Sequence, residues 1–172
     1  MSSDSAARLV AELTAHRWTI AVAESLTGGL LAARFVSVPG ASATFTGGVV
    51  AYATELKASV LGVDRGLLAA RGAVDPAVAR QMAEGVRRVC EVAGRPAELG
   101  LATTGVAGPD WQDGHPPGTV HLGIASPRGI RSVSLELAGD RPTIREQTVA
   151  RAVEEALTEL AEWRAASAEY RS

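Results

Sequence analysis

Apolar and polar residues follow two rhythms along this chain, and each rhythm predicts a different element. Apolar residues three or four positions apart form one face of a helix, whereas short apolar runs bounded by glycine, proline or polar residues are typical of strands. The first pattern predicts helices over residues 5–17, 30–36, 55–61, 76–90 and a long last helix from about 142. The second predicts strands over residues 18–23, 48–52, 99–103, 120–125 and 130–137.

The order of these elements sets the expected fold class. Helices alternate with the first three strands, which is typical of parallel strands joined by crossovers. The last two strands flank Ser126-Pro127-Arg128-Gly129, which has the composition of a hairpin turn and predicts an antiparallel pair. We therefore expect a three-layer α/β fold with a mixed parallel and antiparallel sheet.

The composition is that of one globular domain. The chain has 172 residues, of which 47% are hydrophobic and 21% charged, with no repeat and no low-complexity linker. These proportions exclude disorder, collagen and coiled coil as structures for the whole chain. A formal net charge of −2, without any basic cluster, argues against direct binding of nucleic acid.

Cysteine usage and the N-terminal sequence favour the cytoplasm. Cys90 is the single cysteine, which excludes an intramolecular disulfide, and its place on an apolar helix stripe indicates a small buried side chain. The first four residues lack the pattern of a secretory signal, and no apolar run approaches the roughly 18 residues that span a bilayer. We expect a cytoplasmic protein with no membrane partner.

One count draws attention to a single position. Of 17 basic residues, 16 are arginine and one, Lys57, is lysine, while alanine occurs 32 times. These numbers indicate a coding bias that favours arginine wherever a positive charge is sufficient. Lysine, unlike arginine, can lose its proton when it is desolvated and then act as a base.

Lys57 follows Tyr52 by five residues, at the expected junction of a strand and a helix, from which both could reach one pocket. A serine–lysine pair is one way to activate a hydroxyl without histidine. The alternative interpretation makes Lys57 a solvated surface charge and Tyr52 a core aromatic with its hydroxyl at the surface.

A candidate serine stands in Ala23-Glu24-Ser25-Leu26-Thr27-Gly28-Gly29, between an expected strand end and a helix start. In that place its hydroxyl lies in the open, and backbone N–H groups of the first helical turn point at an oxyanion or a phosphate. Gly28 and Gly29 suit a close approach of a ligand or another backbone. The segment is equally typical of a helix cap by Ser25 or Thr27, although Gly28 stands where a capping box requires Glu or Gln.

Two further segments offer ligand contacts. Thr104-Gly105 begins a long loop that ends at Gly118, and main-chain N–H groups of this loop can hold a phosphate or a carbonyl oxygen. The same pattern is also typical of a structural turn. Arg141, before the last helix, can clamp a phosphate, or pair with Asp140 or Glu146. The histidines have no acidic ligand cluster, and no phosphate-binding glycine motif occurs, so we expect no metal site.

Taken together and in order, these segments resemble the CinA C-terminal domain family, whose members include nicotinamide-nucleotide amidohydrolases. The resemblance covers about residues 6–162. It implies one α/β/α domain with a tail from about 163, and a cytoplasmic bacterial enzyme, often a homodimer, without metal or cofactor. It also implies that Ser25 is the nucleophile and that Tyr52 and Lys57 assist it. The motifs that carry it are Ala23-Glu24-Ser25-Leu26-Thr27-Gly28-Gly29, Pro39-Gly40-Ala41-Ser42, Gly48-Val49-Val50-Ala51-Tyr52, Gly105-Val106-Ala107-Gly108-Pro109, Pro117-Gly118-Thr119-Val120 and Gly139-Asp140-Arg141.

The chain departs from the family pattern in three places. Leu26 stands where the family usually has cysteine, with its side chain expected to point away from the chemistry. The loop 110–115 differs from the glycine-rich sequence usual in the family, and His115 stands where the family commonly has lysine, so the family's substrate contacts are not carried over to this loop. The larger N-terminal domain of full-length CinA is not part of the sequence, so we expect a stand-alone form.

The resemblance predicts that nicotinamide mononucleotide, a small nucleotide, is hydrolysed at its carboxamide to nicotinate mononucleotide and ammonia. N–H groups near Gly28, or at Thr104-Gly105, then stabilise the oxyanion, and Arg141 with the helix start at Gly28-Gly29 holds the phosphate. Two alternatives are an amidase for another nucleotide amide, and a binding module linked to competence and DNA damage. The expected substrate-binding residues are Thr27, Gly28, Gly29, Thr104, Gly105 and Arg141.

Overall fold

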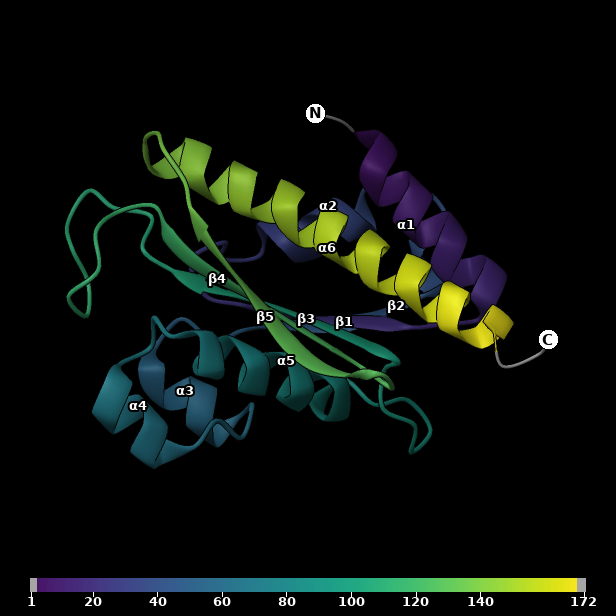
Figure 1. Cartoon of the computed structure of the whole chain (residues 1–172), viewed down its shortest axis with the longest axis horizontal. Helices are drawn as coiled ribbons and strands as arrows, with labels where there is room; N and C mark the ends of the chain where they lie inside the picture. Colours follow the sequence, from purple (N-terminus) through teal and green to yellow (C-terminus); the bar gives the residue numbers. More distant parts are fainter. Residues whose placement is uncertain (1–2, 170–172) are drawn as a thin grey trace.

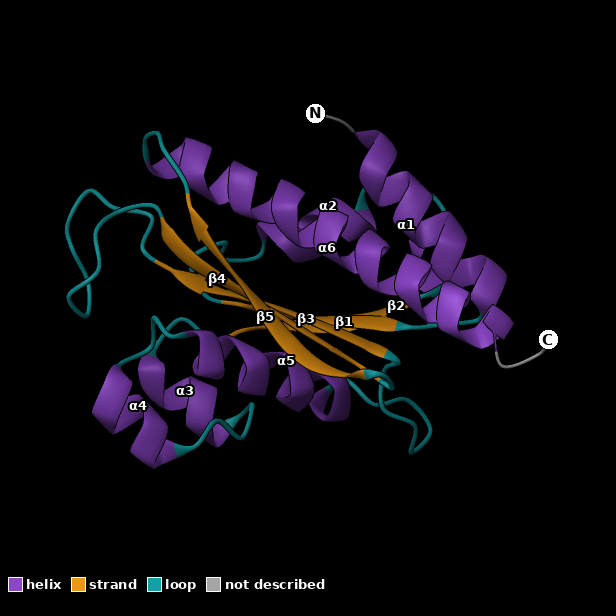
Figure 2. Cartoon of the chain, viewed as in Figure 1, coloured by secondary structure: helices purple, strands orange, loops and turns teal. Residues whose placement is uncertain are grey.

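A single sheet of five strands runs through the part of the chain that this computed structural model describes, residues 3–169 (Figures 1 and 2). The strands are β1 (Ile20–Glu24), β2 (Phe45–Val50), β3 (Leu99–Gly105), β4 (Thr119–Ser126) and β5 (Gly129–Glu136). They are hydrogen-bonded in the order β2-β1-β3-β4-β5. β1 is parallel to both of its neighbours, whereas β3–β4 and β4–β5 are antiparallel pairs, so the predicted mixed sheet is confirmed.

Helices cover both faces of the sheet. They are α1 (Ser3–His16), α2 (Leu30–Val36), α3 (Thr54–Ser59), α4 (Arg65–Arg71), α5 (Pro76–Val89) and α6 (Arg141–Glu169), with a 3-10 turn at Ala41–Ala43. Figure 1 shows α1, α2 and α6 on one face and α3, α4 and α5 on the other, which is the predicted three-layer α/β/α fold. Within residues 3–169, no helix combines the length and the apolar character that crossing a membrane requires.

Strand β1 lies between two hydrophobic cores, because successive side chains of a strand point to opposite faces. Ile20 and Val22 belong to the core under α1, α2 and α6, while Ala21 and Ala23 belong to the core under α5. A strand that is buried on both faces has a continuous apolar sequence rather than an alternating one. This is the pattern from which the strand was predicted.

Helix α5 lies so close to the sheet that β3 and β4 have glycine beneath it. A Cβ atom on Gly100 would lie 2.0 Å from the carbonyl oxygen of Ala83, and one on Gly123 would lie 1.9 Å from that of Ala79. These distances are far below van der Waals contact, so the two glycines set how near the helix packs.

The structure corrects the end of β2 and adds one helix. β2 ends at Val50, two residues before the predicted end, and Tyr52 lies outside the strand. α4 was not predicted, because a helix of seven residues with one buried side chain, Leu68, leaves almost no periodic pattern. Its start is fixed by Asp64, whose carboxylate accepts a hydrogen bond from the N–H of Leu67 at 2.7 Å.

The last helix continues beyond residue 162, where a tail was expected to begin. α6 runs to Glu169, and the ring of Trp163 lies 4.4 Å from that of Trp18 between ring centres. Burial of two large aromatic rings against each other holds this turn of the helix to the domain. The end of the expected tail, residues 170–172, lies outside the described residues.

Replacing Gly123 with alanine should destabilise the fold by about 1–3 kcal/mol or more, since a methyl group there forces α5 away from the sheet. Urea unfolding followed by circular dichroism measures the change. Gly66→Ala, in an exposed turn of α4, is the control and should lie within about 1 kcal/mol of the parent. Equal stability of the Gly123 and Gly66 variants would show that the helix does not depend on the glycine.

Candidate active site

The predicted site segments meet at one edge of the sheet. Because β1, β2 and β3 are parallel, their carboxyl ends lie at the same edge, and β5 also runs in that direction. Ser25 follows β1, Tyr52 follows β2, Gly105 ends β3 and Arg141 follows β5. Ligands of open α/β sheets bind at the carboxyl ends of the strands, where the strand order reverses, and in this sheet that point lies between β1 and β3.

The centre of this edge is a contact between Ser25 and Lys57. The Lys57 amine donates a hydrogen bond to Ser25 Oγ at 3.1 Å, although the two residues are 32 positions apart. Lys57 is 1% exposed and is the one buried side chain of α3, while Ser25 is 9% exposed. The interpretation of Lys57 as a solvated surface charge is therefore wrong.

The surroundings of the Lys57 amine orient it toward Ser25. Its nitrogen also donates hydrogen bonds to the carbonyl oxygen of Ala51 at 2.7 Å and to that of Tyr52 at 3.5 Å. A neutral amine has two N–H groups and one lone pair. In the neutral form the two carbonyl oxygens accept these N–H groups, and the lone pair accepts the hydroxyl proton of Ser25; in the charged form the amine donates to Ser25 Oγ instead.

Burial also favours the neutral amine. Desolvation lowers the pKa of Lys57 to about 8, against the opposing charge of the Asp113 carboxylate, which raises it. An amine with such a pKa can exchange a proton near neutral pH, whereas an exposed lysine remains charged there.

Glu24 is a site residue that the sequence reasoning missed. Its buried carboxylate accepts hydrogen bonds from the N–H groups of Gly29 and Leu31 at 3.0 Å and of Ala32 at 2.8 Å. It caps α2 from the end of β1, and neither Ser25 nor Thr27 caps that helix. The available signal was an acidic residue within a buried strand just before two glycines.

The cap by Glu24 overturns the expected phosphate site at the helix start. The N–H of Gly29 is bonded to Glu24, and the N–H of Gly28 is bonded to the carbonyl oxygen of Ser25 at 3.1 Å. Amide groups that already hold the protein's own oxygens, one of them a carboxylate, are not free for a phosphate or an oxyanion. The glycines instead form the tight turn, with φ values of 57° and 101°.

The two predicted threonines turn their side chains away from the pocket. The hydroxyl of Thr27 lies 2.8 Å from that of Thr103, and the hydroxyl of Thr104 donates to the carbonyl oxygen of Ala73 at 2.7 Å. Both side chains are buried and both hydroxyls are taken. The structure therefore gives neither hydroxyl to a ligand.

A second arginine, Arg145, holds the turn after Ser25. Its guanidinium donates to the carbonyl oxygens of Leu26 and Thr27, both at 2.9 Å. One turn earlier on α6, Arg141 donates to the carbonyl oxygen of Gly108 at 2.8 Å and to the Tyr52 hydroxyl at 3.1 Å. The alternative of an ion pair between Arg141 and its acidic neighbours is not what the structure has.

A pocket of about 260 Å³ opens beside Ser25. Strand ends form one wall and the loop after β3 forms the other. Of the predicted residues, Ser25, Tyr52, Gly105 and Arg141 line it, whereas Lys57 lies behind Ser25 in the protein interior. The other lining residues are Leu26, Val106, Ala107, Gly108, Pro109, Asp110, Trp111 and Gln112.

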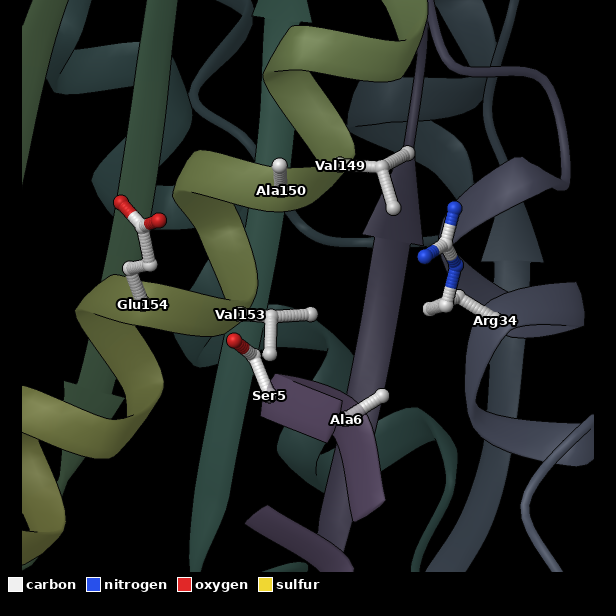
Figure 3. A pocket seen from close by; sticks show the side chains of 7 residues that line it. All are labelled: Ser5, Ala6, Arg34, Val149, Ala150, Val153 and Glu154. Atoms are coloured by element: carbon white, nitrogen blue, oxygen red, sulfur yellow. The ribbon is translucent and has the colours of Figure 1, made fainter. Parts of the chain in front are cut away.

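A second hollow, between α1, α2 and α6, has no such chemistry. Figure 3 shows Ser5, Val149 and Arg34 around it, and Arg34 is already paired with Glu146 at 3.2 Å. Among residues 3–169, no group of three or more His, Cys, Asp or Glu side chains has the arrangement of a metal site. The pocket at Ser25 is therefore the candidate active site.

Sequence comparisons agree with the resemblance seen in the motifs. A family model for the CinA C-terminal domain matches residues 2–160. A CinA-like protein of Frankia casuarinae is 57% identical over 136 residues, 79% of this chain and 30% of that protein. A CinA-like protein of Anaeromyxobacter sp. Fw109-5 is 51% identical over 141 residues, 81% of this chain and 33% of that protein. The chain thus spans about a third of the length of these relatives.

Solved structures of CinA and competence/damage proteins have the same fold as this chain. A competence-damaged protein (CinA) superfamily protein from Klebsiella pneumoniae 700603 has a TM-score of 0.87 at 32% identity, covering 94% of this chain and 98% of that one. The competence/damage inducible protein CihA from Agrobacterium tumefaciens has a TM-score of 0.84 at 32% identity, covering 92% and 94%.

Glu24→Gln should lower the free energy of unfolding by about 1–3 kcal/mol, because an amide NH₂ replaces one of the two oxygens that accept buried N–H groups. Chemical denaturation measures the loss. Glu146→Gln, which removes one exposed ion pair with Arg34, is the matched control and should change stability by at most about 0.5 kcal/mol. A Glu24 variant as stable as this control would mean that the cap contributes nothing.

Proposed function

Because this chain belongs to the CinA C-terminal domain family, we propose that it hydrolyses the carboxamide of nicotinamide mononucleotide to nicotinate mononucleotide and ammonia. The observation that carries the proposal is the 3.1 Å contact between the Lys57 amine and Ser25 Oγ at the floor of a pocket. With this activity go the other properties implied by the resemblance: a cytoplasmic homodimer that uses neither metal nor cofactor.

Each proton in the proposed reaction has a place. As Ser25 Oγ attacks the amide carbon, Lys57 takes the hydroxyl proton; it returns a proton to the nitrogen when the C–N bond breaks, and ammonia leaves. The acyl group is then an ester on Ser25. Lys57 takes a proton from a water that attacks this ester, and returns it to Ser25 Oγ as nicotinate mononucleotide is released.

Backbone N–H groups next to the nucleophile suit the oxyanion. Within the described residues, the N–H groups of Leu26 and Thr27 have no hydrogen-bond partner, although Ser25, Gly28 and Gly29 use theirs. The carbonyl oxygen of Leu26, which shares a peptide plane with the Thr27 N–H, is held by Arg145, and that of Ser25, which shares one with the Leu26 N–H, accepts from Gly28. Both free N–H groups therefore have a set direction. We assign the oxyanion to them in place of Gly28.

Tyr52 and Arg141 form the substrate-facing side of the site. Lys57 reaches Ser25 directly, so the reaction does not require Tyr52 as a proton relay. The Tyr52 hydroxyl instead accepts a hydrogen bond from Arg141, which makes Tyr52 a positioning residue for the guanidinium. Arg141 is the cation lining the pocket and is the proposed partner of the phosphate.

The geometry favours an enzyme over a binding module. Burying an amine is costly unless its hydrogen bonds are satisfied, and a surface that only binds a partner gains nothing from a lysine hidden behind a serine. An amidase acting on another nucleotide amide would use the same Ser25 and Lys57, and a panel of such amides separates this alternative from nicotinamide mononucleotide.

Ser25→Ala should reduce ammonia release from nicotinamide mononucleotide at least about a thousandfold. Lys57→Arg should reduce it about a hundredfold or more, because arginine keeps the charge and cannot supply the neutral base. Lys57→Met keeps the apolar stem but has no amine, so it tests the same role of Lys57 should arginine not fit the buried position. The assay is a coupled measurement of ammonia, with thermal unfolding as a check on the fold.

Ser42→Ala and Arg65→Lys are the matched controls, since both side chains are exposed, and both variants should keep full activity. A wild type inactive on nicotinamide mononucleotide and related amides would refute the proposed function. An active Ser25→Ala or Lys57→Arg variant would refute the assigned roles.

The value of kcat/KM should rise with pH through an inflection near 8, since Lys57 must be neutral to accept the proton. Asp113→Asn should move this inflection to lower pH. The asparagine oxygen still accepts the hydrogen bond from the Ala73 N–H, but the negative charge that raises the pKa of Lys57 is gone. Initial rates between pH 6 and 10 measure both inflections. An unmoved inflection in Asp113→Asn would mean that the Asp113 charge does not act on Lys57, and a wild-type profile without an inflection near 8 would mean that Lys57 does not set it.

A further inference from the structure

Trp111 differs from the other tryptophans of the chain. Trp18 is buried, and its ring packs on that of Trp163. Trp111 is 67% exposed, yet it lies on the wall of the pocket that contains Ser25. An aromatic ring left in water beside a candidate nucleophile needs a reason, because burying it elsewhere would stabilise the fold.

The loop that carries Trp111 is held in place. Asp113 accepts a hydrogen bond from the Ala73 N–H at 2.9 Å, and its carboxylate occupies space that a Cβ atom on Gly72 would fill, at 2.7 Å. Next to Trp111, Gln112 and His115 exchange two backbone hydrogen bonds, at 3.1 and 2.9 Å. A ligand that uses Trp111 therefore meets a loop that is already ordered, which lowers the entropy cost of binding.

The charged side chain next to Trp111 in the pocket lining is a carboxylate, that of Asp110. The positive group, Arg141, comes from the start of α6 and is bonded to Tyr52 and to Gly108, at the beginning of the same loop. The face of an indole ring carries negative potential and attracts cations placed over it, more strongly than any other side-chain ring does. The pocket thus has one part suited to an anion and another suited to a flat cation.

We propose that Trp111, supported by Asp110, is the specificity determinant for a positively charged aromatic ring, the N-substituted pyridinium of the substrate, while Arg141 takes its phosphate. The inference rests on the proposed function and names what that function leaves open, the chemical feature by which this chain's own loop recognises its substrate. It predicts that a pyridinium nucleotide is preferred over the same nucleotide with a neutral, reduced ring.

The test measures binding and turnover separately. Titration calorimetry on the Ser25→Ala protein, with or without Trp111→Leu, gives Kd for three probes: nicotinamide mononucleotide, its reduced dihydro form and ribose 5-phosphate. Trp111→Leu should raise Kd about tenfold for the pyridinium nucleotide. The effect should be clearly smaller for the reduced form, and Kd for ribose 5-phosphate should stay within twofold.

Arg141→Met is the matched comparison, because it should weaken all three probes, each of which carries the phosphate. Asp113→Ala, which releases the loop, should behave like Trp111→Leu, while Asp113→Asn, which keeps the hydrogen bond to Ala73, should not. Trp111 is exposed, so the thermal unfolding of its variant should match that of the parent.

Binding of nicotinamide mononucleotide that depends on Trp111, without turnover by the wild type, would refute the proposed function and support this inference. Turnover of nicotinamide mononucleotide by the wild type, together with a Kd that Trp111→Leu leaves unchanged, would support the proposed function and refute this inference. A change in oligomeric state with an unchanged Kd would assign Trp111 to a contact between protein molecules and overturn the inference, as would equal effects on the cationic and the reduced ring.

Discussion

Two buried ionisable side chains flank Ser25, and the site depends on how each is satisfied. Glu24 precedes Ser25 in the chain, and its carboxylate accepts three N–H groups at the start of α2, from Gly29, Leu31 and Ala32. Lys57 approaches from α3 and gives its amine to Ser25 and to the carbonyl oxygen of Ala51. Because unsatisfied buried charges are costly, these bonds fix the bend after β1 and the end of β2 together. Ser25 is held where the two meet.

The sheet topology turns distant segments into one pocket. β1 has parallel neighbours on both sides, so the segments that follow β1, β2 and β3 emerge at one edge, and the hairpin of β4 and β5 returns the chain to the same edge. α6 then starts there with Arg141, which reaches Tyr52 and Gly108, and Arg145, which reaches the turn after Ser25. One helix therefore ties the floor and the rim of the pocket together.

The periodic patterns located nearly every element, and the errors have local causes. α4 is too short to show a period, and its cap by Asp64 is one residue among many polar ones. Thr27 and Thr104 were placed in the site because they adjoin its motifs, but a side chain's neighbours depend on which way it points. The hydroxyl of Thr104 donates to the carbonyl oxygen of Ala73, in the segment between α4 and α5. The glycines after Ser25 marked a tight turn correctly, whereas the group held by the helix start is Glu24 of the same chain.

The sequence by itself determined the α/β class, the motif set and the singular position of Lys57, because periodicity, turn residues and composition are properties of the chain's order. Only the tertiary structure decided that Lys57 is buried against Ser25, that Arg141 faces Tyr52 and that Trp111 stands in solvent over the pocket. Burial, and with it the pKa of an amine, arises from residues that lie far apart along the chain and meet only when the sheet has formed.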